Sequence, residues 1–340
     1  MHQEKEHIMD KIRWGVLSTS SFAERKFIPG LRKSPMIDVA AVASRDLGRS
    51  LAFADRCGIA QAYGSYEALL ADPTIDVIYN ALPNSMHVQW TKRAAEAGKH
   101  VLCEKPMGLT AAELDPLLPL ADRVHIAEGV MVRFHPQWTE TRDIVRSGQL
   151  GIVSHMHVAF SYNNTDPGDI RNNAATGGGA LYDIGCYAIV AARWFMDAEP
   201  LRVVALVGTD PEFGTDRLTS AIIDFGDGRM CTFQVSTQAV YHQRAHVYGT
   251  LGRLEITIPF NQPQDDQTIY LLHEGQSVDG LDARQFIVPA NDQYTSQGEA
   301  FSLRVRNEVP TRAPLLDAIA NMRVIDAVFR SATTGSFETI

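Results

Sequence analysis

Cysteine is scarce in this chain, and the scarcity narrows the class of protein. Only four of the 340 residues are cysteines, at Cys57, Cys103, Cys186 and Cys231. Their spacing fits no zinc-binding pattern, and four thiols are too few to hold a chain of this length together by disulfides. We therefore expect four reduced thiols, no bound metal ion and a cytoplasmic location.

Basic residues and long apolar runs are also scarce. The 31 basic residues are outnumbered by 40 acidic ones, which gives a formal net charge of −9. A nucleic-acid-binding protein usually presents a basic face, so nucleic acid is not an expected partner.

No apolar run approaches the ~20 residues that span a bilayer, and the polar start MHQEKEHIMD lacks the apolar core of a signal peptide. We expect a soluble protein with no membrane partner, whose residues 1–10 form a flexible tail.

The chain does have enough apolar residues for a large core. Its hydrophobic fraction is 45%, and its length favours two domains. In the first third, strand-like runs alternate with helical stretches. The strands are expected at 12–17, 37–43, 76–81 and 100–104, and the helices at 21–31, 47–57, 66–70 and 85–97, with a glycine cap at Gly98. This alternation is typical of βαβ units, so residues 11–128 are predicted to form an α/β, doubly wound Rossmann domain with a parallel sheet.

The second part has a different periodicity. Apolar and polar residues alternate in twos, which predicts strands at 154–160, 219–225, 230–237 and 254–258, with a hairpin turn at Asp227-Gly228. Helices are expected near 179–195 and 315–330. Residues 129–340 are therefore predicted to form an α+β domain with a large, open, mostly antiparallel sheet, after a boundary near 128–133. An open sheet needs a partner, so we expect a homodimer or homotetramer formed through its uncovered face.

The turn after the first strand lacks the glycines of a typical dinucleotide site. The standard spacing places glycine at positions 18 and 20 and glycine or alanine at 23. This chain has Ser18, Ser20 and Ala23 instead. Serine is small, its hydroxyl can donate to a phosphate, and the turn opens the first βαβ unit, where the site belongs. We place the cofactor phosphates at this turn, on Ser18, Thr19, Ser20, Phe22 and Ala23. An ordinary strand-to-helix turn with a serine cap is the alternative.

The end of the second strand indicates which dinucleotide is bound. An NAD-binding fold usually has an acidic residue there, which bonds the ribose 2′-hydroxyl. Ser44 and Arg45 occupy that place here, and both can bond a 2′-phosphate, Arg45 in a bidentate pair. We therefore predict NADP(H) in preference to NAD(H). Two alternatives stay open: Asp46 binds the ribose, or Arg45 is a solvated surface residue.

Longer motifs carry a resemblance to a known family. Pro83 with His87 is similar to a P-x-x-x-H helix entry, residues 97–106 read AGKHVLCEKP, and residues 177–187 read GGGALYDIGCY. In this order, after RWG at 13–15, they resemble the Gfo/Idh/MocA oxidoreductase family along nearly the whole chain. The resemblance implies a cis bond between Lys105 and Pro106. It also implies a nicotinamide cofactor beside Leu82, Pro83, Asn84, His87, Glu104 and Lys105.

One branch of that family is most similar. Several members have histidine where this chain has Tyr187. The tyrosine, the STS turn at 18–20 and the PGDIR stretch at 167–171 resemble glucose-fructose oxidoreductase, NADP-dependent xylose dehydrogenases and dimeric dihydrodiol dehydrogenases. Glucose-fructose oxidoreductase carries a twin-arginine leader, which this sequence lacks, so we do not expect its exported form with tightly bound cofactor.

The residues also point to a chemistry. Hydride transfer from an alcohol needs a base for the hydroxyl proton and a group that stabilises the developing alkoxide. Lys105 follows a strand end, where open α/β sheets place ligands. Tyr187 and Asp183 lie one helical turn apart and share a face. We assign Lys105, Tyr187 and Asp183 as catalytic: Tyr187 exchanges the proton, Lys105 orients the substrate and lowers the pKa of Tyr187, and Asp183 bonds the lysine and a substrate hydroxyl. The alternatives are a surface lysine, a helix-start acid and a packed aromatic.

Other polar residues receive weaker interpretations. Arg171 and Asn163 precede the glycine run and are expected to bind substrate hydroxyls, whereas Tyr162 is expected to be a packing residue. His87 either touches the cofactor or only caps and packs. The run at 177–179 is either a flexible loop or a place where backbone approaches the nicotinamide or the sugar. His155 and His157 share a strand face, which favours a solvated or interface face over a metal pair.

These patterns, together with the family resemblance, predict an NADP-dependent oxidoreductase. The resemblance implies that it transfers a hydride between nicotinamide and a CH–OH group of a small-molecule substrate, a sugar (aldose or ketosugar) or a cyclic diol, with oxidation of a CH–CH bond as the variant for a diol. The alternative from another class is a non-catalytic NADP-binding sensor or regulator on the same fold, and a lyase or glycosidase that uses the cofactor transiently is a third. The sequence does not indicate which sugar, which carbon or which direction.

Overall fold

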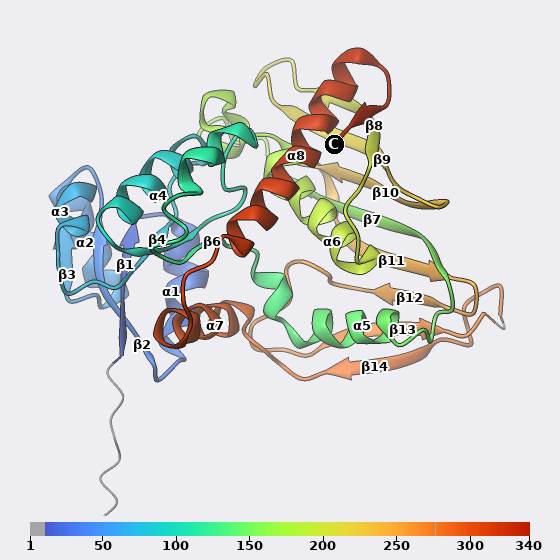
Figure 1. Ribbon diagram of the computed structural model, residues 1–340, viewed down its shortest axis with the longest axis horizontal. Helices are drawn as coiled ribbons and strands as arrows, with labels where there is room; N and C mark the ends of the chain where they lie inside the picture. The colour runs from blue at the N-terminus through green and yellow to red at the C-terminus, as the bar shows by residue number, and fades with distance from the viewer. Residues whose placement is uncertain (1–10, 276) are drawn as a thin grey trace, which may run out of the picture.

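The computed structural model of this chain describes residues 11–275 and 277–340. It contains a parallel sheet of six strands near the N-terminus and a sheet of nine strands in the second part, with helices around both (Figure 1). The predicted fold class is therefore confirmed. The flexible tail expected at residues 1–10 lies outside the described residues.

The first sheet has the strand order β3-β2-β1-β4-β5-β6, and all its pairs are parallel. This order, 3-2-1-4-5-6, is that of a dinucleotide-binding fold. Its central strands are apolar on both sides, and all of β4 is buried, as expected where helices cover both faces. The strands are β1 (Ile12–Leu17), β2 (Ile37–Ala43), β3 (Gln61–Tyr63), β4 (Val77–Asn80), β5 (His100–Cys103) and β6 (Ile126–Glu128).

Local signals fix the helices of this part. The Asp46 side chain accepts from Arg49 N and caps α2, and Gly58 ends the helix in the left-handed region, with φ +59°. Gly98, expected as a cap, has φ +78° just beyond α4. The helices are α1 (Ile28–Arg32), α2 (Leu47–Cys57), α3 (Tyr66–Leu70) and α4 (His87–Glu96), with short turns η1 (Ala23–Phe27), η2 (Asn84–Met86), η3 (Ala112–Leu117) and η4 (Met131–Phe134).

The first helix differs from the continuous one expected at 21–31. It starts as the π-helical turn η1 and becomes α-helical only in α1. Pro29 lies in the first turn of α1 and has no backbone N–H, so the regular hydrogen-bond ladder cannot run through it. The widened turn precedes this break.

The second sheet has the order β14-β13-β12-β11-β7-β10-β9-β8-β15. Its pairs are antiparallel except β7 with β10, which is parallel. The hairpin turn expected at Asp227-Gly228 joins β9 to β10, and both residues have positive φ, +52° and +74°. The strands are β7 (Val153–Asn163), β8 (Arg202–Thr209), β9 (Asp216–Gly226), β10 (Arg229–Ser236), β11 (Gln238–Gly249), β12 (Arg253–Ile256), β13 (Thr268–His273), β14 (Arg284–Val288) and β15 (Glu338–Thr339).

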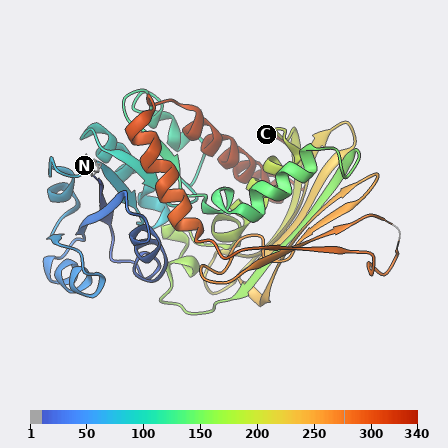
Figure 2. The ribbon, with the colours of Figure 1, turned by 90° about the horizontal axis from the view of Figure 1, so that it is seen from below.

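Helices cover one face of this sheet. In Figure 2 they lie on one side of it, and the described residues place no helix on the other side. On that uncovered side Leu206, Leu218, Ile222 and Met230 are exposed. The elements of this part are α5 (Pro136–Arg146), α6 (Cys186–Met196), α7 (Gln293–Asn307) and α8 (Ala313–Thr334), with the turns η5 (Ile170–Asn172), η6 (Ala174–Thr176) and η7 (Leu181–Gly185). None of the helices in the described ranges has the length and hydropathy needed to cross a membrane.

Helix α7 joins the second part to the first, although the expected domain boundary precedes it by more than a hundred residues. It lies beside α1 (Figure 1). The indole of Trp14 packs edge-on against Phe301 and donates to the Ser302 hydroxyl at 3.2 Å. Thr295 donates to Gly30 O at 2.7 Å. The core is therefore continuous between the two parts, and the geometry of a site between them is fixed.

Candidate active site

A cavity of about 710 Å³ lies between the two parts, at the carboxyl ends of β4 and β5. Open α/β sheets bind ligands at this edge. Ten of the residues expected to bind cofactor or substrate line it: Ser20, Phe22, Leu82, Asn84, His87, Glu104, Lys105, Arg171, Asp183 and Tyr187.

The expected phosphate turn has the backbone of a glycine turn without the glycines. Ser18 has φ +107°, a conformation that glycine adopts at little cost and other residues rarely do. The Ser20 hydroxyl accepts from Ala23 N at 3.2 Å, so Ser20 caps the helix that follows. Ser18, Thr19 and Ala23 do not line the cavity, and Ala23 is fully buried. The serine cap and the glycine-like turn are present together.

At the end of β2, Arg45 follows Ser44, whose hydroxyl group already makes hydrogen bonds within the protein. Ser44 Oγ donates to Asp46 O at 2.7 Å and accepts from Ser50 Oγ at 2.9 Å. Its hydroxyl hydrogen is thus already used, contrary to the expectation that it is free for a phosphate. Asp46, the alternative ribose ligand, caps α2 instead. Arg45 is exposed at this end, where it bonds the Tyr66 side chain and lies near Arg49.

His87 lies between the loop that contains Leu82 and the turn that contains Pro106. It is fully buried, and its ring nitrogens each lie 2.7 Å from a backbone oxygen, Nδ1 from Pro106 O and Nε2 from Leu82 O. Burial lowers the pKa of His87 to about 4, and a neutral ring donates only one of these bonds. The side chain is therefore buried between the entry of α4, which follows Pro83, and the Lys105-Pro106 turn, and it hydrogen-bonds one of them.

The Glu104-Lys105-Pro106 turn combines a cis peptide bond with a buried, hydrogen-bonded carboxyl group. The bond between Lys105 and Pro106 is cis, as the resemblance implied. Tyr79, in β4, donates to Glu104 Oε1 at 2.5 Å. Burial raises the pKa of Glu104. Lys105 Nζ reaches across to Asp183 in the second part.

The Asp183 carboxylate interacts with three donor side chains, those of Lys105, Arg171 and Tyr162. Lys105 Nζ donates to Asp183 O and, at 3.1 Å, to Asp183 Oδ1. Arg171 Nε lies 3.2 Å from the same Oδ1, and the Tyr162 hydroxyl donates to Oδ2 at 2.5 Å. The expectation that Tyr162 only packs is therefore wrong. Burial opposes ionisation of Asp183, but the charges of Lys105 and Arg171 and these bonds hold its pKa below its ordinary value.

The same pairing keeps Lys105 cationic. Burial by itself would lower the pKa of Lys105, but the acidic groups around it, Asp183 first and Glu104 among them, together more than offset this, so the pKa lies above its ordinary value. The lysine is therefore a donor, not a base, at neutral pH.

Tyr187 lies beside Lys105 but is not activated by it. Lys105 Nζ is 4.9 Å from the centroid of the Tyr187 ring, and the Tyr187 hydroxyl donates to Met131 Sδ at 3.2 Å. Burial, followed by the charge of Glu104, raises the pKa of Tyr187 well above 10. The expectation that Lys105 lowers this pKa is wrong for this arrangement, since the ammonium faces the ring and the phenol oxygen is desolvated.

The glycine run 177–179 is a packed turn, not a flexible loop. Gly177 and Gly179 have positive φ, +79° and +119°. A Cβ on Gly178 would lie 2.4 Å from Arg171 O, and one on Gly179 would lie 1.9 Å from Asp216 Oδ1. Because Gly179 has no side chain, the buried Asp216 can approach it. Asp216 Oδ2 accepts a hydrogen bond from Leu181 N at 2.7 Å. This bond holds the start of η7, the π-helical turn that carries Asp183 into α6 with Tyr187.

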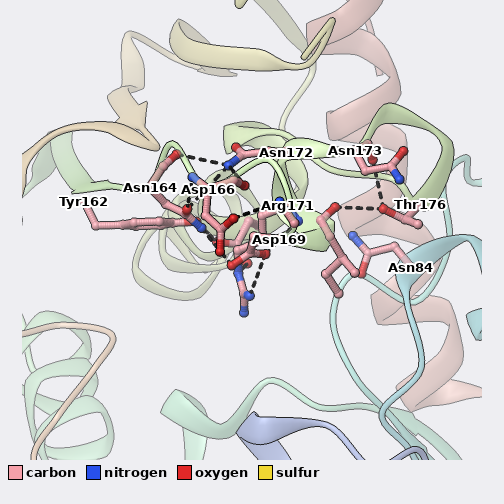
Figure 3. A network of polar contacts seen from close by, with 12 residues as sticks. Asn84, Tyr162, Asn164, Asp166, Asp169, Arg171, Asn172, Asn173 and Thr176 are labelled. Atoms are coloured by element: carbon pink, nitrogen blue, oxygen red, sulfur yellow. Dashed lines mark hydrogen bonds and ion pairs between the residues drawn. The ribbon is translucent and has the colours of Figure 1, made fainter. Parts of the chain in front are cut away.

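The segment before the glycine run is folded by its own polar side chains (Figure 3). Asn164 Nδ2 donates to Asp169 Oδ2 at 2.8 Å, and Asn172 Nδ2 donates to Asp166 O at 2.9 Å. Asp169 in turn accepts from Arg171 N at 2.9 Å, which sets the arginine towards Asp183. Asn84, from the first part, donates to Gly177 O at 2.8 Å and ties the segment to the cofactor side.

Some expected residues lie elsewhere, and some lining residues were not expected. Ser44, Arg45, Pro83 and Asn163 do not line the cavity, and Asn163 is exposed at the end of β7. Sequence analysis missed Met131, Asn261, Tyr294 and Asp169, which do. Asn261 and Tyr294 follow the glycine run by many residues, and no spacing signals them. The PGDIR stretch contains Asp169 and could have indicated it.

The histidine pair lies far from this chemistry. His155 stacks on Tyr248, with ring centroids 4.3 Å apart, and His157 Nδ1 lies 2.9 Å from Thr232 Oγ1. Within the described ranges no group of three or more His, Cys, Asp or Glu side chains could hold a metal ion.

Comparison with known proteins gives the family. Residues 12–133 match the oxidoreductase family with an NAD-binding Rossmann fold, and residues 138–255 match the GFO/IDH/MocA C-terminal domain. An uncharacterized oxidoreductase of Rhizobium meliloti is 45% identical over 98% of this chain and 100% of its own. A D-xylose 1-dehydrogenase (NADP(+)) of Haloferax volcanii is 36% identical over 95% of this chain and 98% of its own.

Solved structures agree. The crystal structure of a 3-ketoreductase from Actinomadura kijaniata, in complex with NADP and TDP-benzene, superposes with a TM-score of 0.88 at 30% identity, over 95% of this chain and 98% of the other. The fold and site define an NAD(P)-binding oxidoreductase. The chain belongs to the Gfo/Idh/MocA family, and the resemblance read from its motifs is confirmed.

Proposed function

We propose that this protein is an NADP-dependent oxidoreductase that transfers a hydride between nicotinamide and a sugar, either an aldose or a ketosugar, or a cyclic diol. One observation carries the proposal. Lys105, from the first sheet, and Tyr187, from the second part, line the same cavity, and Lys105 is held there by Asp183. The Haloferax relative is named for xylose and NADP, and the Actinomadura structure contains NADP, which supports both halves of the proposal.

The side chains divide the work as follows. The nicotinamide, when bound, supplies or accepts the hydride. Lys105 stays cationic and donates to the reacting oxygen, which stabilises negative charge as it develops. Tyr187 exchanges the proton. Its raised pKa keeps the phenol protonated at neutral pH, which is the form that donates to a carbonyl, so the resting site is prepared for reduction. Asp183 keeps Lys105 in place, and Arg171 approaches the same carboxylate from the solvent side.

The residues present fit an NADP molecule. Ser18 gives the phosphate turn a glycine-like backbone, and Arg45 and Arg49 both lie near Tyr66, where their charges oppose the rise that burial gives to its pKa. Two guanidinium groups near the end of β2 would form charge-assisted bonds with a 2′-phosphate, whereas a neutral 2′-hydroxyl offers them only a weaker hydrogen bond. We therefore propose NADP in preference to NAD.

Cofactor kinetics on Arg45→Ala test this preference. Loss of a charge-assisted bond should reduce kcat/KM for NADP by about 10- to 100-fold while NAD is little affected. Arg32→Ala is the matched control, because Arg32 is an exposed arginine that donates to Gly58 O at 2.7 Å. An NADP/NAD ratio equal to that of the parent would show that Arg45 does not read the cofactor.

A substrate screen tests the reaction itself. Aldoses, ketosugars and cyclic diols are offered in both directions with NADP and NAD side by side, and absorbance of the reduced cofactor is followed. We expect turnover with at least one of these classes. Tight NADP binding by calorimetry without turnover of any class would favour a non-catalytic sensor and contradict the proposal.

We also infer the roles of the two domains, the oligomeric state and the cellular location of the protein. Residues 11–128 would bind the cofactor and residues 129–340 the substrate and a second copy. The exposed Leu206, Ile222 and Met230 support a homodimer or homotetramer through the uncovered face of the nine-stranded sheet. A monomer in light scattering would contradict this assembly. The buried, unpaired thiols agree with a cytoplasmic location.

A further inference from the structure

We propose that Tyr162 is a positioning residue for the reaction: its hydroxyl holds the Asp183 carboxylate so that Lys105 stays aimed at the reacting oxygen. The inference rests on the proposed function, because it assigns Lys105 that role. It concerns a residue that no motif of the chain contains.

The two oxygens of Asp183 have different partners. Oδ2 accepts from the Tyr162 hydroxyl at 2.5 Å. Oδ1 is shared by Lys105 Nζ at 3.1 Å and Arg171 Nε at 3.2 Å. One oxygen therefore orients the carboxylate, and the other orients the ammonium.

The side chains that donate to Asp183 differ in exposure. That of Lys105 is only 14% exposed and that of Arg171 is 40% exposed, while Asp183 itself is 15% exposed. A substrate hydroxyl that enters from solvent can displace Arg171 from Oδ1. Tyr162, on β7, is half-buried and lines the cavity wall. Like Lys105, it is a donor that stays in place during this exchange.

Loss of the Tyr162 hydroxyl has a defined chemical consequence. A buried carboxylate oxygen without a donor is costly, so Asp183 would turn, draw Lys105 onto both oxygens or take up a proton more readily. Each response moves the ammonium or weakens its pairing. Because Tyr162 acts through Asp183 and Lys105, its removal should lower kcat more than it changes cofactor affinity.

Tyr162→Phe is the test variant, and Tyr182→Phe is its matched control. Tyr182 lies next to Asp183 in sequence, is also half-buried and donates to a backbone oxygen, Leu109 O at 2.7 Å, but it does not line the cavity. We expect Tyr162→Phe to lower kcat by about 10- to 100-fold, with unchanged NADP affinity. Tyr182→Phe should keep kcat within about threefold of the parent at a similar loss of thermal stability.

A second readout does not depend on turnover. In protein labelled with ¹³C at the aspartate carboxyl carbons, with Asp183→Asn used for assignment, the Asp183 signal is recorded at neutral pH, where its carboxylate is ionised. Loss of a hydrogen bond to one carboxylate oxygen changes the shielding of its carbon, so the Asp183 chemical shift should change in Tyr162→Phe and stay at the parental value in Tyr182→Phe.

The two readouts separate this proposal from the proposed function. If the parent turns over no sugar or diol but the Asp183 signal shifts as expected, the function is wrong and the positioning of Asp183 by Tyr162 stands. If Tyr162→Phe leaves the Asp183 chemical shift unchanged, or if its kcat matches that of Tyr182→Phe, Tyr162 is not a positioning residue.

Discussion

At the scale of single residues, the site pairs a cation with a protonated phenol. Asp183 fixes the charge of Lys105, and burial fixes the protonation of Tyr187. The Tyr187 hydroxyl has only the weak acceptor Met131 Sδ at 3.2 Å. A carbonyl or hydroxyl oxygen of a substrate is a better partner, so the phenol can turn to it without loss of a strong bond.

Removal of that hydroxyl tests its role. Tyr187→Phe keeps the ring over which Lys105 lies and deletes only the proton donor. We expect turnover to fall by about 10²- to 10⁴-fold, the range for general acid–base groups, with NADP binding retained. Tyr294→Phe serves as control, because Tyr294 is another buried phenol that lines the cavity. Near-parental kcat in Tyr187→Phe would remove Tyr187 from the mechanism.

At the scale of elements, the placement of the proposed catalytic residues Asp183 and Tyr187 depends on how η7 begins. Asp216, on β9, accepts from Leu181 N and from the Thr219 hydroxyl, at 2.7 and 2.9 Å. The approach of Asp216 is open only because Gly179 has no side chain. A turn between two helical segments is thus anchored by a strand that follows it by more than thirty residues.

Gly179→Ala should break this anchor. An added Cβ would meet Asp216 Oδ1 at 1.9 Å in a backbone with φ +119°, so Asp216 or η7 must move. We expect both a loss of stability above the ~1–2 kcal/mol of a strained backbone and a fall in kcat. Gly214→Ala is the control, since Gly214 has φ +68° and no atom within 4 Å of an added Cβ.

Urea unfolding and kcat, measured on variants shown to be folded by circular dichroism, separate the outcomes. Gly214→Ala should lose stability alone. If Gly179→Ala loses no more stability than Gly214→Ala and keeps its kcat, the anchor does not position the catalytic turn.

The elements also show what the sequence could predict. Strand β2 and helix α2 have the expected bounds because their signals are local: apolar runs, the Asp46 cap and Gly58. Lys105, Asp183 and Tyr187 were found because they lie in long motifs. The widened turns η1 and η7, the partner Asp216 and the Tyr162 bond depend on contacts between distant segments, and no periodicity reports those. The pKa of Tyr187 was misjudged for the same reason, since burial is a property of the packed site.

At the scale of the whole molecule, charged groups of the second part lie near Glu128, at the edge of the first sheet. Arg193, on α6, donates to Asp317 on α8 at 2.9 Å, and Arg133 bonds the same carboxylate. Glu128, at the end of β6, accepts from Met107 N at 2.8 Å and faces these charges. Helix α8 packs against β6, the edge strand of the first sheet, and these charges lie near Glu128.

Glu128 makes the stability of this assembly depend on pH. Burial raises the pKa of Glu128 from about 4.5 to about 7, and the charge of Asp317 acts in the same direction. Above pH 4.5 the unfolded chain has released this proton while the folded protein still holds it. The folded state therefore loses stability as pH rises from 4.5 to 7, by at most on the order of 3 kcal/mol, and the loss is constant above that range.

Glu128→Gln removes the titration and keeps an acceptor for Met107 N. Its thermal midpoint should lie close to that of the parent at pH 5 and above it by several degrees at pH 8. Glu113→Gln is the matched control, because Glu113 is exposed and also accepts from a backbone N–H, Leu109 N at 3.0 Å. Surface replacements of this kind change stability little. If the gain of Glu128→Gln is the same at pH 5 and pH 8, the carboxyl does not titrate in the folded protein between these values, and the charges of Arg133 and Arg193 hold it ionised.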